Sequence, residues 1–242
     1  MKKVLSILIL LTLVSYEAFT QQTDPQPIYK IPRDQSTLQQ TPAATIAEVP
    51  REAKRKLGIK AGYNIASIYG KTPNFTPKST NGFSIAGFFA PASRGLGYRT
   101  EIVFSRQGFS FDENGNLQNI SQDYVYMPHL TTFTIAKRIQ LQAGGQIGYL
   151  LNAKKTSEEN SSKEDAVTRY MNRFDYGATV GLELYPFKGL ILGGRYNISM
   201  GNIYKHYSES SQTPTLPVPL PVNPQDFKGK NAVINFFVGY MF

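Results

Sequence analysis

Apolar and polar residues alternate over segments of roughly ten residues in most of this chain, and this alternation constrains the fold more than any other feature. A period of two predicts a β-strand that has one apolar face and one polar face. Pro128 and His129 interrupt the fourth such segment, so the facing of that segment stays open. Eight segments show the pattern: 57–65, 82–90, 96–107, 124–135, 139–151, 174–184, 190–200 and 234–242.

The connections between these segments are long and short in turn. Long loops are expected after the first, third, fifth and seventh strands, including one over residues 111–122 and a charged one over 152–172. This rhythm is typical of an up-and-down outer-membrane barrel, which has short periplasmic turns and longer extracellular loops. In hydrocarbon every backbone polar group must pair within the protein, so strands can span a membrane only as a closed barrel. The sequence therefore predicts an all-β, eight-stranded antiparallel transmembrane barrel over residues 56–242.

The polar faces of these strands carry charges of both signs. An unpaired charge in a low-dielectric interior costs several kcal/mol, so we expect a structural network of ion pairs in the lumen. An eight-stranded barrel has room for little more than its own side chains, which predicts a filled interior and not a pore. The expected members of the network are Lys60, Arg99, Glu101, Asp175, Glu183 and Arg195.

The first 20 residues are typical of an export signal. A basic start, Met1-Lys2-Lys3, precedes the apolar stretch 4–14, which is too short to cross a bilayer and fits a secretory signal peptide. Residues 21–55 are rich in Gln, Thr and Pro and are interpreted as a flexible periplasmic tail. We expect the bacterial outer membrane as the destination. Export argues against nucleic-acid binding despite the net charge of +9.

Several strand motifs occur in the order of a known family. They include KLGIKAGYN, GYRTEIVFSRQGF, LQAGGQIGYLL, FDYGATVGLELYPF and AVINFFVGYMF. On these motifs the chain resembles the PorT-like outer-membrane β-barrel domain family, the small eight-stranded barrels of Bacteroidetes-type bacteria. The resemblance implies fold and location, gives no activity, and is compatible with a role in a secretion or envelope assembly. The aromatic C-terminus ending at Phe242 is similar to the signal read by the barrel-assembly machinery, so this machinery and outer-membrane lipid are expected partners.

Little in the sequence points to catalysis. His129 and His206 are the two candidate imidazole bases, and His206 lies in a Ser-rich loop that provides no preorganised geometry. Cysteine is absent, and no ligands have the spacing of a metal site. We therefore expect a non-enzymatic barrel without cofactor or metal. A barrel enzyme acting on lipid is the alternative, and a small channel or transporter for apolar molecules is a third, which the charged lumen disfavours.

A proline-rich stretch, residues 213–224, lies in the longest loop and predicts an extended polyproline II conformation. Such a segment either docks into an aromatic-lined groove of a partner or acts as a spacer. Protein partners are accordingly expected at the extracellular loops or at the periplasmic tail, and the leading function is a structural, binding or accessory one. The candidate docking residues are Pro214, Leu216, Pro217, Val218, Pro219, Leu220 and Pro221.

Overall fold

The computed structural model describes residues 56–70, 76–91, 96–113, 115–136, 138–157, 164–205 and 228–242. The predicted signal peptide, the tail and the proline-rich segment lie outside these ranges. Within them, no helix is long and apolar enough to cross a membrane. The elements are β1 (Lys56–Tyr69), β2 (Lys78–Ala90), β3 (Leu96–Glu113), β4 (Asn116–Ala136), β5 (Ile139–Ser157), β6 (Glu164–Ala166), the short 3₁₀ helix η1 (Thr168–Tyr170), β7 (Phe174–Leu184), β8 (Leu190–Ser199) and β9 (Lys230–Met241).

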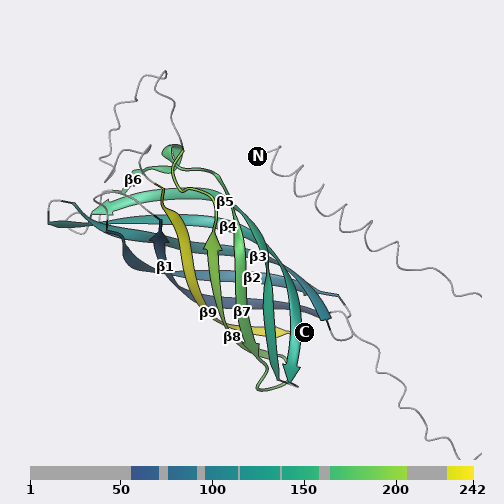
Figure 1. Ribbon diagram of the computed structural model, residues 1–242. Helices are drawn as coiled ribbons and strands as arrows, with labels where there is room; N and C mark the ends of the chain where they lie inside the picture. Colours follow the sequence, from purple (N-terminus) through teal and green to yellow (C-terminus); the bar gives the residue numbers. More distant parts are fainter. Residues whose placement is uncertain are drawn as a thin grey trace, which may run out of the picture. The chain divides into compact units, whose positions relative to one another are not determined.

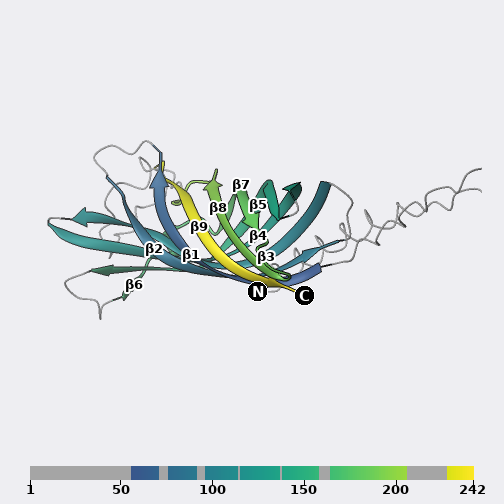
Figure 2. The same cartoon turned by 90° about the horizontal axis from the view of Figure 1, so that it is seen from below.

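Eight of these strands form a closed antiparallel ring (Figure 1). The ring follows the order of the chain and closes where β1 pairs with β9, as the view from below shows (Figure 2). The short strand β6 pairs with β5 and lies outside the ring. The predicted eight-stranded up-and-down barrel is confirmed. The turn at 185–189 and the C-terminus lie at one end, which the rule of short periplasmic turns assigns to the periplasm.

The two faces of each strand differ as the alternation predicts. On β1, the side chains of Leu57, Ile59 and Tyr63 are 50–58% exposed, whereas Lys60 and Asn64 are at most 5% exposed. Successive side chains of a strand point to opposite faces, so the apolar residues cover the outer wall and the polar residues line the interior. A wall of this kind suits hydrocarbon and would be costly in water.

The strands β3, β4 and β5 are longer than the sequence pattern suggests, with 18, 21 and 19 residues. The prediction of a long loop at 111–122 is wrong, because β3 and β4 run through these residues. They are joined by a tight turn at Gly115, whose φ of +85° suits glycine. Asp and Asn residues give this stretch the composition of a loop. The interior-facing Phe109, Phe111 and Ile120 are nevertheless almost fully buried, and their packing extends the hairpin.

The charged loop expected at 152–172 is likewise partly regular structure. β5 continues to Ser157, and β6 and η1 follow. Val167 N donates to Ala153 O at 3.0 Å, and the Thr168 hydroxyl accepts from Ala153 N at 2.8 Å. These bonds hold the segment against β5, near the end of the barrel opposite the C-terminus (Figure 1).

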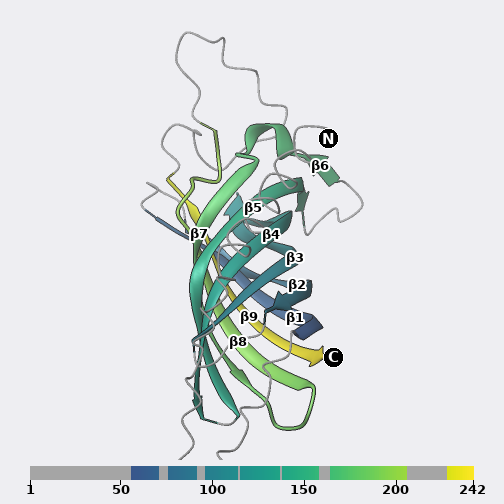
Figure 3. The ribbon, with the colours of Figure 1, turned by 90° about the vertical axis from the view of Figure 1, so that its right-hand side faces the viewer.

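The facing of the fourth strand is decided by the structure. β4 continues through Pro128 and His129, with Tyr126 and Leu130 buried inside and Phe133 exposed outside. The β3–β4 register passes from Thr100↔His129 to Val103↔Tyr126, so Pro128 falls between paired positions of that ladder. Proline has no N–H to donate, and this position tolerates it. Figure 3 shows β4 lying between β3 and β5.

A charge on the outer wall should destabilise the barrel according to its depth. Val180 lies near the middle of β7 and is 55% exposed, while Leu184 ends that strand. We expect Val180→Arg to lower the free energy of unfolding by about 2–4 kcal/mol and Leu184→Arg by about 0–1 kcal/mol. Denaturant titration in lipid vesicles measures both. Equal effects would contradict the placement of this wall in the membrane.

Candidate functional site

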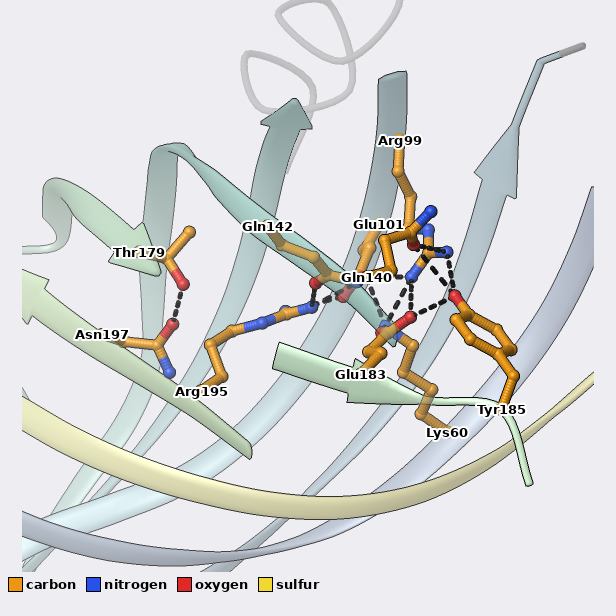
Figure 4. Close-up of polar contacts among 10 residues, drawn as sticks. All are labelled: Lys60, Arg99, Glu101, Gln140, Gln142, Thr179, Glu183, Tyr185, Arg195 and Asn197. Atoms are coloured by element: carbon orange, nitrogen blue, oxygen red, sulfur yellow. Dashed lines mark hydrogen bonds and ion pairs between the residues drawn. The ribbon is translucent and has the colours of Figure 1, made fainter. Parts of the chain in front are cut away.

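Five of the six predicted lumen residues come together inside the barrel (Figure 4). They are contributed by four strands, because inward positions of a narrow barrel face one another across the lumen. Each is at most 7% exposed. The members of this ion cluster are Lys60 on β1, Arg99 and Glu101 on β3, Glu183 on β7 and Arg195 on β8.

The ion cluster is a chain of alternating charges. Lys60 Nζ lies 2.6 Å from Glu101 Oε1 and 2.7 Å from Glu183 Oε1, so this ammonium bridges both carboxylates. On one side of this bridge, Arg195 Nη1 lies 2.8 Å from Glu101 Oε2. On the other side, Arg99 Nη1 lies 2.7 Å from Glu183 Oε2. Each carboxylate is thus held between two cations, a geometry that offsets much of the cost of burying it.

Three cations and two carboxylates leave the cluster with a formal excess of one positive charge. Two phenylalanine rings lie beside the cations. Lys60 Nζ is 5.0 Å from the Phe88 ring centroid and 4.7 Å from that of Phe237, and the guanidinium carbons of Arg99 and Arg195 lie 4.6 Å from Phe88 and 5.4 Å from Phe237. The negative faces of aromatic rings attract cations, so these rings stabilise the excess charge.

Sequence reasoning missed both rings, although a signal was present. Phe237 lies on the polar stripe of β9, two residues from Asn235, where an aromatic residue is out of pattern. Gly58 and Gly193 also lie on inward stripes. A Cβ at Gly58 would stand 2.3 Å from Phe88 Cζ, and one at Gly193 would stand 2.3 Å from Phe237 Cζ. These glycines therefore make room for the rings.

Neutral side chains bind the outer groups of the cluster. Gln142 Oε1 accepts from Arg195 Nη2 at 2.8 Å, and Gln140 Oε1 accepts from Arg99 Nη2 at 3.1 Å. The Tyr185 hydroxyl donates to Glu183 Oε2 at 2.6 Å and accepts from Arg99 Nη2 at 3.0 Å. Burial, and after it the Glu183 carboxylate, raises the pKa of Tyr185 well above its usual value, so the hydroxyl keeps its proton.

Asp175, the sixth residue of the predicted network, does not join the cluster. It accepts hydrogen bonds from Tyr126 Oη at 2.8 Å and Ser199 Oγ at 2.5 Å. Asp175 and Glu183 both lie on β7, eight residues apart. At a rise of about 3.3 Å per residue they are separated by about 26 Å along the strand. The alternation gives both residues the same facing, but it does not place them at the same depth.

The interior changes from polar to apolar toward the extracellular end. A small polar cavity of about 30 Å³, lined by Asn64, Tyr126, Arg195 and Asn235 among others, has room for about one water molecule. Beyond this cavity the interior is apolar: residues of β1, β3, β4 and β5 pack with the segment around η1 and with Ile203 and Tyr204. The cluster contains Ile68, Phe109, Phe111, Ile120, Tyr124, Tyr126, Leu150, Ala153, Val167, Tyr170, Met171, Ile203 and Tyr204.

Of the two candidate imidazole bases, His129 lies within the described residues. His129 Nδ1 lies 2.7 Å from Tyr98 Oη and 3.2 Å from Thr100 Oγ1, neither of which is a serine or a carboxylate. His206 and the docking segment lie outside the described residues. Among the residues that the structure covers, no group of three or more His, Cys, Asp or Glu could hold a metal ion.

A closed sheet with an apolar outer wall and a paired, charged interior defines a transmembrane β-barrel of the outer-membrane type. Residues 39–205 match the sequence model of the family described as outer membrane protein beta-barrel domain. The chain belongs to this family, and its location is the bacterial outer membrane. A comparison with curated proteins finds no match.

Solved structures of small outer-membrane barrels resemble this chain at low sequence identity. Ail, the attachment invasion locus protein of Yersinia pestis, has a TM-score of 0.44 and 15% identity, over 78% of this chain and 99% of that one. Neisserial surface protein A has a TM-score of 0.46 and 11% identity, over 77% and 97%. OprG of Pseudomonas aeruginosa has a TM-score of 0.41 and 14% identity, over 79% and 97%.

Replacing Glu183 by Gln should destabilise the barrel more than replacing Lys60 by Met. Glu183→Gln removes the close carboxylate partner of Arg99, and breaking a buried ion pair in this way costs about 3–5 kcal/mol. Lys60→Met leaves Glu101 paired with Arg195 and Glu183 paired with Arg99. Glu183→Gln raises the formal charge of the cluster from +1 to +2, whereas Lys60→Met lowers it to zero. Urea titration in lipid vesicles gives the free energies of unfolding. A larger loss for Lys60→Met would show that the bridging ammonium, and not the total charge, determines stability.

Proposed function

We propose that this protein is a non-enzymatic outer-membrane barrel with a structural, binding or accessory role, which acts through its ends and not through its interior. The ion cluster is the observation that supports this proposal. Its bonds cross the lumen from β1 to β7 and from β3 to β8. Charged side chains that are paired across the cross-section leave no path for apolar molecules, and breaking them would be costly.

The extracellular end supports a binding role. There β3, β4 and β5 extend the barrel, and a buried apolar cluster fixes η1 and the segment near Tyr204 against them. Asn172 Nδ2 donates to the backbone oxygens of Asn202 and Tyr204 at 2.7 and 3.0 Å, which ties the two segments together. A rigid end of this kind can present the adjoining loops to a protein partner.

The resemblance to PorT-like barrels refines the proposal toward an accessory role in a secretion or envelope assembly. The C-terminus suits the expected recognition by the barrel-assembly machinery. Phe242 is 72% exposed, and its ring packs edge-on against Tyr240 with centroids 5.5 Å apart. The aromatic end is therefore accessible, while outer-membrane lipid covers the apolar wall beside it.

Purified protein in planar bilayers should show no stable conductance. The paired charges fill the cross-section, and their separation would be needed before ions could pass. A general porin, reconstituted in the same way, serves as the positive control. Reproducible single-channel steps from the folded barrel would contradict the proposal and favour a channel.

Deleting residues 213–224 should remove protein crosslinks at the cell surface while leaving the barrel folded. Crosslinking with mass spectrometry in intact envelopes compares the deletion with the parent chain. A variant in which a Gly/Ser stretch of equal length replaces these residues separates docking from spacing, because it restores the length but not the polyproline II conformation. An unchanged set of crosslinked proteins in both variants would eliminate the docking segment.

A further inference from the structure

A hollow of about 540 Å³ opens at the periplasmic end of the barrel. Three cations from separate parts of the chain line it: Lys56 at the start of β1, Arg138 in the β4–β5 turn and Lys188 in the β7–β8 turn. No acidic side chain is among the described residues that line this hollow. Its volume lies within the range of about 300–1,000 Å³ that is usual for ligand sites.

The inner end of the hollow is in contact with the ion cluster. Gln140 and Tyr185 both line the hollow, and both bind Arg99, the last cation of the charge chain. Arg99 itself is 2% exposed and is not among the residues that line the hollow. Gln140 and Tyr185 therefore connect the hollow to the ion cluster.

The electrostatics of this end favour an anion. The three lining cations add to the excess positive charge of the cluster directly behind them. A cleft lined by charges of one sign, with low-dielectric walls, focuses the field and raises the local concentration of counter-ions. A group with several charged oxygens can contact cations from three directions at once, which a single carboxylate cannot do as well.

We infer that the periplasmic hollow binds an oxyanion of the phosphate class. The phosphate belongs either to a free anion or to a phospholipid headgroup. The rim is compatible with a lipid, because Leu57 beside Lys56 and Phe187 beside Lys188 are 58% and 73% exposed. A cation next to an exposed apolar residue can bind a headgroup while its neighbour contacts acyl chains.

The test uses the full mature chain in nonionic micelles and two probes. In the first arm, inorganic phosphate is titrated at constant ionic strength while the unfolding temperature is followed. In the second arm, native mass spectrometry compares retention of phosphatidylglycerol with that of diacylglycerol, which lacks the phosphate. The site variant carries Lys56→Gln, Arg138→Gln and Lys188→Gln. The control carries Lys78→Gln, Arg169→Gln and Lys228→Gln, the same loss of charge at exposed positions away from this end.

A rise of the unfolding temperature that saturates with inorganic phosphate identifies a free anion, if the apparent affinity for phosphate is at least about tenfold weaker in the site variant than in the control. Retention of phosphatidylglycerol but not of diacylglycerol, lost in the site variant alone, identifies a lipid headgroup. Equal behaviour of the two variants, or saturation in neither arm, overturns the inference. All six substituted residues are at the surface, so both variants should fold, which their heat-modifiable mobility on gels checks.

Discussion

Closure of the sheet is the constraint on which the rest of this structure depends. Hydrocarbon offers no partner to a backbone N–H or C=O, so the first and last strands of the barrel must pair with each other. They do so along a continuous register from Gly58↔Met241 to Tyr69↔Lys230. Because the alternation of side chains is fixed by the strand, closure also sorts the residues. The apolar stripe faces lipid, and the polar stripe is enclosed in a narrow space.

That narrow space explains the chemistry of the interior. Side chains from opposite walls reach one another, and five ionisable groups form a chain in which each carboxylate lies between two cations. The rings of Phe88 and Phe237 lie against the cations and stabilise the excess positive charge. They can approach the cations closely because Gly58 and Gly193 carry no side chain. The charges of the interior are thus paired with one another, and our proposal places the function at the two ends of the barrel, which differ in character. The extracellular end is extended and apolar inside, while the periplasmic end is hollow and basic.

Particular residues show how far the sequence could predict this site. Five members of the ion cluster could be chosen from the sequence, because each places a charge at an inward position of a strand that is otherwise apolar or rich in small residues. They are Lys60, Arg99, Glu101, Glu183 and Arg195. Asp175 satisfied the same criterion and yet binds Tyr126 and Ser199 instead, because the criterion gives facing but not depth. Residues 111–122 have the composition of a loop and form a hairpin, because the buried packing of Phe111 and Ile120 outweighs local preference.

The sequence by itself determined the number of membrane strands and the facing of most of them, because the pleat repeats every two residues and is a local property of the chain. Only the tertiary structure decided which charges meet, how far β3, β4 and β5 extend, and that a basic hollow adjoins Arg99. The partners of Lys60 lie 41 and 123 residues away, and Arg195 lies 94 residues from Glu101. Contacts over such separations depend on the register of every intervening strand pair, which no local pattern specifies.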